Sequence, residues 1–203
     1  MLISPYNLIL PLLIVNFIVF PYDAKRIDNT ALYFDIVMNE KTIGNLKATE
    51  TNKNSRQYFH SSTTVKTKII RNITVNYNYE VSFANDLLKK SDVKITINDR
   101  PHAETSTEWR NNEYQMVKNG KEKEVFKRSI DYTTILLYFE EPVNISSCFS
   151  EQEGTFNTII PLGNHSYKKI NSKGKENIYY YKDGALEKAT IDGGLANFQL
   201  IAK

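Results

Sequence analysis

The stretch ITVNYNYEVSF, residues 73–83, decides the fold class, because apolar and polar side chains alternate along it without interruption. Successive side chains of a β-strand point to opposite faces, so this alternation predicts a strand with one apolar face shielded from water and one polar face. We expect the polar side chains of Asn76, Asn78 and Glu80 to face solvent. The apolar set faces either the protein's own core or a cavity that holds a ligand, and it consists of Ile73, Val75, Tyr77, Tyr79, Val81 and Phe83.

The same period of two recurs from about residue 30 onward, and no window of helical length shows a clean 3.6-residue stripe. Turn residues such as Asn119-Gly120 and Asp183-Gly184 separate the alternating segments. A strand over 73–83 would extend about 36 Å at roughly 3.3 Å per residue, and sheets of long twisted strands coil. We therefore predict an all-β domain of around ten strands, built as a single antiparallel, strongly curved sheet that forms an up-and-down barrel or half-barrel.

The segment IDYTTILLYFEEPV, residues 130–143, departs from this pattern because its apolar residues cluster without strict alternation. Asp131 is placed to cap a short helix, and Pro142 is placed to close it. The β-branched and aromatic content suits a strand nearly as well. We expect a short helical or irregular segment near 130–143 that forms a lid, a plug or a corner.

The N-terminus carries an apolar run from Leu8 to Phe20, which has the length of a secretory h-region. A retained membrane anchor is the alternative, because counting from Leu2 brings the run close to the roughly 20 residues that a bilayer requires. We expect residues 1–24 to be a signal peptide or an N-terminal anchor, and residues 25–203 to form a single β-barrel-like domain in the periplasm or cell envelope. The membrane would be contacted only through an uncleaved N-terminus.

The overall composition argues against several classes of function. The 26 basic and 23 acidic residues give a formal charge of +3, without the basic excess that phosphate neutralisation needs, so no nucleic-acid partner is predicted. The single cysteine, Cys148, rules out an intramolecular disulfide, and we expect a buried thiol in preference to a reactive one. His60, His102 and His165 lack the spacing of metal ligands, and no cofactor motif is present, so neither a metal nor a cofactor is predicted.

Two pairs of polar residues invite a catalytic interpretation. Glu140 and Glu141 are adjacent, but adjacent side chains of an extended segment point to opposite faces, so one of them is better explained as an anchor or a surface charge. Ser150 and Glu151 precede a glycine, a position at which polar side chains commonly bond to the backbone of a turn. We predict no catalytic residue and a protein that is not an enzyme.

Aromatic residues are the remaining candidates for a site, because a tyrosine ring can pack while its hydroxyl reaches a polar group of a ligand. The alternative is an aromatic core with cross-strand pairs on the surface. The predicted ligand-lining residues are Tyr77, Tyr79, Phe83, Trp109, Tyr114, Phe139 and Tyr180.

Several strings resemble a family of uncharacterised bacterial exported envelope proteins, which is known as a domain of unknown function. They are LYFEEPV at 137–143, SSCFSEQEGTF at 146–156 and NIYYYKDGALEKATID at 177–192, together with KTIGNLKATE and NYNYEVSF earlier in the chain. The likeness spans roughly residues 31–202 and implies an all-β periplasmic or surface protein, but it transfers no functional residue. More distantly, the architecture is similar to lipocalins and to the LolA-like half-barrels of lipoprotein carriers, which hold apolar ligands; that similarity is one of fold alone.

The leading hypothesis is an exported, non-enzymatic β-barrel or half-barrel that binds a lipid or another hydrophobic ligand. The alternative is a structural or interaction protein of the cell envelope, with a fully packed core and an envelope protein as its partner. An interior cavity would favour the first hypothesis.

Overall fold

The computed structural model describes residues 29–68, 72–193 and 197–203, so the predicted leader or anchor at 1–24 lies outside the described residues. Within these ranges, fourteen strands form one antiparallel sheet in the order β8-β7-β6-β5-β4-β3-β2-β1-β14-β13-β12-β11-β10-β9. The prediction of a single curved antiparallel sheet is confirmed, although the strand number exceeds the expected ten. The sheet is not closed, which makes the fold a half-barrel.

The N-terminal half of the sheet is a meander of long strands, and the C-terminal half is a meander of shorter ones. The first comprises β1 (Asn29–Met38), β2 (Lys41–Lys53), β3 (Arg56–Lys68), β4 (Asn72–Ala84), β5 (Leu87–Ile97), β6 (Arg100–Arg110), β7 (Glu113–Lys118) and β8 (Glu122–Phe126). The second comprises β9 (Ser147–Ser150), β10 (Thr155–Gly163), β11 (Ser166–Ile170), β12 (Glu176–Lys182), β13 (Ala185–Asp192) and β14 (Asn197–Ala202). The two halves join where β1 pairs with β14, from Phe34 opposite Ala202 to Val37 opposite Gln199.

Many of the connections are two-residue turns in which both residues have positive φ. Such turns match the right-handed twist of antiparallel strands, and asparagine tolerates this backbone conformation better than most residues. The abundance of asparagine in the chain therefore has a structural reason. The pairs are Asn39-Glu40, Asn54-Ser55, Asn85-Asp86, Asn98-Asp99, Asn111-Asn112, Asn164-His165 and Asp183-Gly184.

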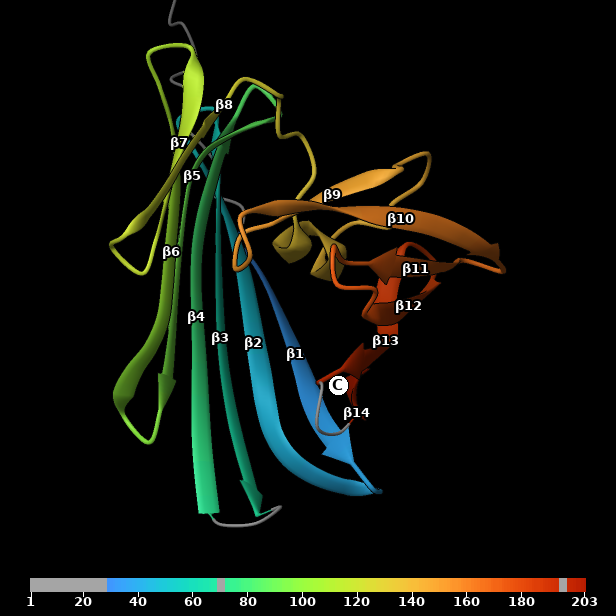
Figure 1. Ribbon diagram of the computed structural model, residues 1–203. Coiled ribbons are helices and arrows are strands. Elements are labelled where there is room, and N and C mark those ends of the chain that lie inside the picture. The colour runs from blue at the N-terminus through green and yellow to red at the C-terminus, as the bar shows by residue number, and fades with distance from the viewer. Residues whose placement is uncertain (1–28, 69–71, 194–196) are drawn as a thin grey trace, which may run out of the picture.

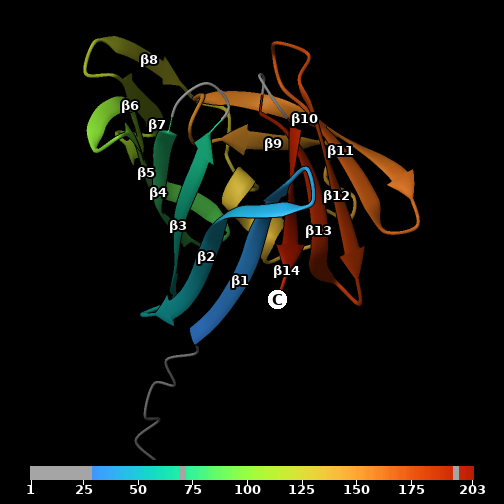
Figure 2. The same cartoon turned by 90° about the horizontal axis from the view of Figure 1, so that it is seen from below.

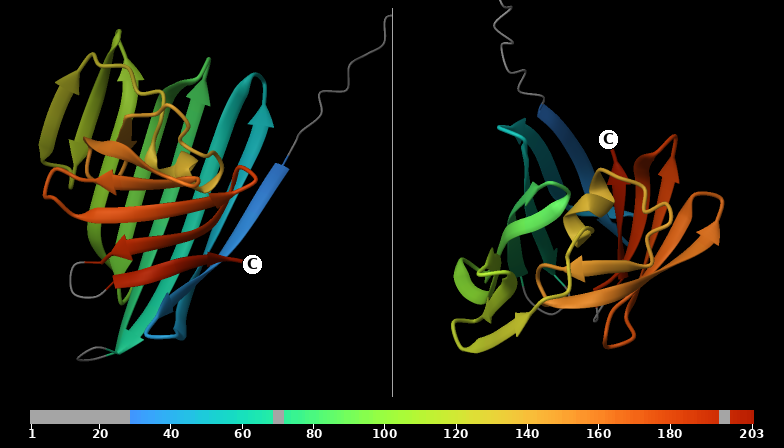
Figure 3. Two further views of the ribbon diagram at one scale, coloured as in Figure 1. Left: turned by 90° about the vertical axis from the view of Figure 1, so that its right-hand side faces the viewer. Right: turned by 90° about the horizontal axis from the view of Figure 1, so that it is seen from above.

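The curvature of the sheet makes its two halves face each other. In Figure 1 the long strands β2 to β6 stand upright, whereas β9 and β10 run across them. Figure 2 shows the two walls from below, with a short helical segment between them, and Figure 3 shows β10 to β14 crossing in front of β1 to β4. Among the described residues, that segment is the only helical element, η1 (Thr134–Tyr138), and no helix is long and apolar enough to cross a bilayer.

The connection between β8 and β9, residues 127–146, turns into the space between the walls and forms a plug. Ile135, Leu136 and Leu137 of η1 are buried. The Leu88 amide donates to the Ile130 carbonyl at 2.9 Å, and the Tyr181 hydroxyl donates to the Leu137 carbonyl at 2.7 Å, so both walls hold the segment. The expected short helical or irregular segment near 130–143 is confirmed, and of the three roles considered for it, the structure shows the plug.

The two edge strands, β8 and β9, approach each other without pairing. The Phe126 ring lies 6.0 Å from that of Phe149 and 6.2 Å from that of Phe156. Arg128 stacks on Phe156 at 3.7 Å and donates to the Ser147 hydroxyl at 2.8 Å. Side-chain packing therefore brings the edges together where the hydrogen-bonded ladder stops.

The stretch 73–83 forms most of β4, which pairs with β3 along its whole length. Its apolar face is divided: Val81 and Phe83 are buried in the core, whereas Tyr77 and Tyr79 are only partly buried. Glu80 on the other face is exposed as predicted. The predicted solvent exposure holds only in part for Asn76 and Asn78, because neighbouring strands half cover them, with Thr64 donating to Asn76 at 3.0 Å and His60 bonding to Asn78 at 2.8 Å.

Candidate functional site

A cavity of about 360 Å³ lies below the plug, between the two walls of the sheet. One side of it is apolar and comes from the inward faces of β1 to β4, with two residues of β14 beside them. The period-two alternation of these strands places every second side chain on this face. The apolar lining consists of Ile36, Leu46, Val65, Val75, Phe198 and Leu200, together with Ile191 of β13.

Tyrosines occupy the boundary between this apolar side and the rest of the cavity. Tyr77 and Tyr79 come from β4, Tyr138 from η1 and Tyr179 from β12. The Tyr79 hydroxyl donates to the Gln152 side chain at 3.1 Å, which ties β4 to the turn between β9 and β10. Burial raises the pKa of Tyr77 and of Tyr79, so both hydroxyls stay protonated. The Tyr77 hydroxyl can donate its hydrogen bond to a ligand, whereas that of Tyr79 donates to Gln152.

The opposite side of the cavity is polar and comes from the inward faces of β10, β11 and β12 and from the first residue after β11. We call Asn157, Lys169, Asn171 and Asn177 the polar wall. The register explains their proximity, because Lys169 lies opposite Ile159 on one side and Asn177 on the other, which makes Asn157 its diagonal neighbour. An apolar wall therefore faces a polar wall across the cavity.

Lys169 is the buried cation of the polar wall, with 8% of its surface exposed. Its ammonium interacts with the Tyr179 hydroxyl. Burial lowers the pKa of Lys169, but the electrostatic influence of its surroundings, led by Tyr179, outweighs this effect and leaves the pKa above the usual value. Lys169 is therefore charged at neutral pH.

Glu151 is the buried acid next to the cavity, and its surface is fully covered. Its carboxylate accepts hydrogen bonds from the backbone amides of Thr134 at 3.1 Å and Ile135 at 3.0 Å. These amides lie at the start of η1, where backbone donors have no acceptor within the helix itself. Burial raises the pKa of Glu151, whereas these bonds and Lys169 lower it; the net shift is upward. The bonds to backbone amides far along the chain differ from the local turn bond predicted for this residue.

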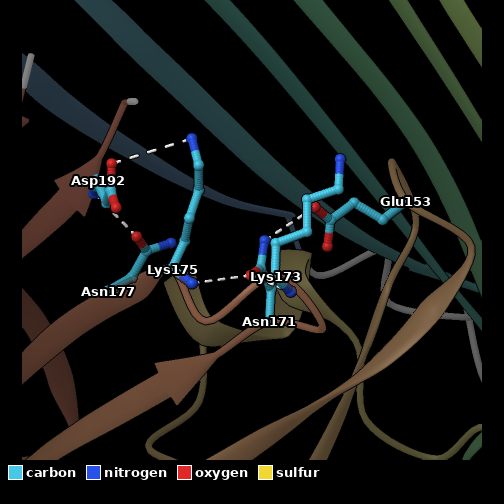
Figure 4. Close-up of polar contacts among 6 residues, drawn as sticks. All are labelled: Glu153, Asn171, Lys173, Lys175, Asn177 and Asp192. Atoms are coloured by element: carbon cyan, nitrogen blue, oxygen red, sulfur yellow. Dashed lines mark hydrogen bonds and ion pairs between the residues drawn. The ribbon is translucent and has the colours of Figure 1, made fainter. Parts of the chain in front are cut away.

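The rim of the polar wall is a set of paired side chains, shown in Figure 4. The Asn171 side-chain amide donates to Glu153 at 3.0 Å, and its oxygen accepts from the backbone amides of Lys173 and Lys175 at 2.9 Å each. The Lys175 ammonium lies 3.9 Å from the Asp192 carboxylate. These contacts hold the loop between β11 and β12 over the edge of the cavity.

The predicted ligand-lining residues are spread over the molecule. Tyr77 and Tyr79 line the cavity, as described above. Phe83 and Tyr114 are fully covered core residues, Trp109 packs against Tyr114 at 4.7 Å, and Phe139 packs against Phe59 at 5.2 Å. Tyr180 is 37% exposed and lies under Lys188 on the outer face, because its parity is opposite to that of Tyr179 and Tyr181. Only Tyr77 and Tyr79 of the seven belong to this cavity.

The sequence pattern predicts neither the polar wall nor the strand β9. In the structure Lys168 faces outward and pairs with Glu176 at 2.9 Å, so the adjacent Lys169 of β11 faces inward. The turn role predicted for Ser150 is confirmed, since its hydroxyl accepts from the Glu153 amide at 3.2 Å.

The residues considered for catalysis make contacts that hold the fold together. Glu141 accepts hydrogen bonds from the Tyr167 hydroxyl at 2.7 Å and from His165 at 2.9 Å, so it anchors the plug to β11. Cys148 is buried as predicted, and burial raises the pKa of its thiol to about 12. In the part of the chain that the structure describes, no cluster of three or more potential metal ligands occurs.

Comparison with known proteins places the chain in a family without assigning it an activity. No curated protein matches it. A crystal structure of a beta-barrel-like protein of a domain of unknown function, DUF1849, from Brucella abortus is similar in fold, with a TM-score of 0.50, 10% identity, and coverage of 87% of this chain and 96% of that one. The sequence model of another family, the domain of unknown function DUF6134, matches residues 34–203, and the protein therefore belongs to the DUF6134 family.

Proposed function

We propose that the protein is a non-enzymatic carrier or receptor that binds an amphipathic, lipid-like small molecule between the two walls of its half-barrel. The observation that carries this proposal is the cavity of about 360 Å³ with one apolar and one polar wall. Its volume lies at the lower end of the ~300–1,000 Å³ typical of small-molecule sites. The apolar wall would gain from covering a hydrocarbon chain, and the tyrosines and the polar wall would orient the polar end.

The cavity also bears on the alternative, a structural or interaction protein of the envelope with a packed core. The plug fills the upper part of the half-barrel with side chains such as Ile130 and Leu137, which are fully covered. Below it, Val75, Tyr77 and Tyr79 border open space. A core that is packed in one part and open in another favours the ligand-binding function.

The place of action proposed for the protein is the periplasm or cell envelope. The apolar run Leu8 to Phe20 supports export, either with cleavage or with retention as an anchor. An exported lipid binder of this kind shields the hydrocarbon part of its ligand from water.

Native mass spectrometry of gently purified protein tests the function directly. We expect an added mass that organic extraction removes, and binding of the uncharged fluorescent probe N-phenyl-1-naphthylamine once the native ligand is removed. Val75→Trp places a large side chain in the cavity and should weaken probe binding by about tenfold or more. Val125→Trp is the matched control, because Val125 is 59% exposed on the edge strand β8, and its probe binding should equal that of the wild type.

The absence of both a co-purifying molecule and probe binding would refute the proposed function. Equal weakening of probe binding by the two tryptophan variants would also refute it, because the bound probe would then lie outside the cavity.

A further inference from the structure

The polar wall contains a buried cation without an acidic partner. Lys169 is 8% exposed, yet in the part of the chain that the structure describes its ammonium has no carboxylate within the 4.0 Å of an ion pair. A lysine side chain normally extends until its charge reaches water, and burying an unpaired charge is costly. Its neighbour Lys168 follows this rule on the outer face, where it pairs with Glu176 at 2.9 Å.

The nearby acids are engaged elsewhere. Both carboxylate oxygens of Glu151 accept amides at the start of η1, at 3.0 and 3.1 Å. Glu153 accepts from Asn171 at 3.0 Å, and Asp192 lies 3.9 Å from Lys175. An incoming anion would therefore find Lys169 available without displacing any of these contacts.

Beside Lys169, the wall contains a buried polar atom without a hydrogen-bond partner. The side-chain oxygen of Asn157, a residue with 3% of its surface exposed, has no hydrogen-bond partner among the described residues, and Asn157 lines the cavity. Buried polar atoms are nearly always satisfied, so an exception facing a cavity indicates a missing partner. Asn157 is the diagonal neighbour of Lys169 across β10 and β11, which places an acceptor beside the cationic donor.

We propose that the polar wall recognises the head group of an anionic amphiphile, with the anion on Lys169 and a hydroxyl of the same head group on Asn157. This inference rests on the proposed function and specifies its ligand. The shared chemistry is a carboxylate or a phosphate that carries a hydroxyl nearby, attached to a hydrocarbon chain that covers Leu46, Val65 and Val75. A hydrogen bond to a charged group stabilises more than a neutral one, so the charge should dominate the selectivity.

Displacement of N-phenyl-1-naphthylamine by four probes of equal chain length tests the proposal: dodecanoate, 3-hydroxydodecanoate, dodecyl phosphate and dodecanol. We expect the wild type to bind an anionic probe about 10- to 100-fold more tightly than dodecanol. The carboxylate and the phosphate distinguish the two sources of the anion. 3-Hydroxydodecanoate should bind more tightly than dodecanoate, and Asn157→Leu should remove that difference.

Lys169→Met keeps the length of the side chain but removes its charge, so it should abolish the preference for anions by lowering their affinity to about that of dodecanol in the same variant. Lys168→Met is the matched control on the outer face and should behave as the wild type. If Lys169→Met fails to fold, Lys169→Arg keeps the charge and must keep the anion preference.

The outcomes separate the inference from the function on which it rests. Equal affinity of the wild type for dodecanol and for both anions overturns the head-group assignment and leaves the cavity as a binding site. An anion preference that survives in Lys169→Met likewise overturns the role of Lys169. Binding of neither the naphthylamine probe nor any of the four amphiphiles overturns both.

Discussion

The hydroxyl of Tyr167 holds the plug in place, and Tyr167→Phe removes one oxygen atom from that contact. The hydroxyl donates to Glu141 at 2.7 Å, and both side chains are 9% exposed. A hydrogen bond to a charged partner contributes about 1.5–3 kcal/mol. We therefore expect Tyr167→Phe to lower the free energy of unfolding by about 1.5–3 kcal/mol near pH 7.

The pH dependence of this cost follows from the pKa of Glu141. The bond from Tyr167, followed by the contact with His165, lowers that pKa below 4.5, so the folded state holds this proton more weakly than the unfolded state. A carboxyl group of this kind contributes its stability above the ordinary pKa, and the contribution is lost as the pH falls through the depressed value. The cost of Tyr167→Phe should therefore shrink by at least about half at a pH below this depressed pKa, where a neutral pair remains.

Urea denaturation followed by the fluorescence of the single tryptophan, Trp109, measures both free energies. Tyr180→Phe is the control, because its side chain is exposed on the outer face, and it should change stability by less than about 0.5 kcal/mol at either pH. A cost for Tyr167→Phe that equals the control near pH 7, or that is the same at both pH values, would refute the reasoning.

Three further substitutions or reactions test the packing around the cavity and plug. Gly44→Ala should destabilise β2 and β3 by about 1–3 kcal/mol or more in urea, because the added Cβ would meet the Thr64 carbonyl oxygen of the backbone. Gly154→Ala should cost about 1–2 kcal/mol in the same assay, since φ is +72° there and the Cβ would lie 2.8 Å from the Met116 methyl group. The Cys148 thiol, buried and with its pKa raised to about 12, should react with a disulfide reagent near pH 8 only at the rate of unfolding, and fast labelling of native protein would contradict its placement.

The architecture of the sheet was predictable because it depends on local signals. Alternation identifies the strands, and asparagine at the first turn position identifies tight hairpins such as Asn85-Asp86. The strand β9 escaped prediction because Ser147–Ser150 has only four residues, too few for a period of two to stand out. Its pairing with β10 depends on Thr155 and its neighbours, which come after the intervening turn.

The cavity could not be predicted from the same signals. Tyr79 and Val81 share one face of β4, yet Val81 is buried in the core and Tyr79 borders the cavity. The residues that face Tyr79 and Val81 come from the segment 130–179. The alternation within β4 carries no information about residues so distant in the sequence. The inward lysine of β11 was hidden for a related reason, since Lys168 and Lys169 are equivalent by residue type and only the register separates them.

The open space follows from the difference between the length of strands β2 to β4 and the size of the plug. Strands β2, β3 and β4 have 13 residues each, whereas η1 has five. The plug packs on the apolar face at Phe34, through Tyr138, and at Phe59, through Phe139. Below it, the apolar residues of β4 face Asn157 and Lys169 of the polar wall. Collapse of the two walls would bury a charge and an unpaired amide against hydrocarbon, which costs several kcal/mol or more. A molecule that is apolar on one side and anionic on the other would satisfy both walls, and this makes the polarity of the cavity a better guide to its ligand than its volume.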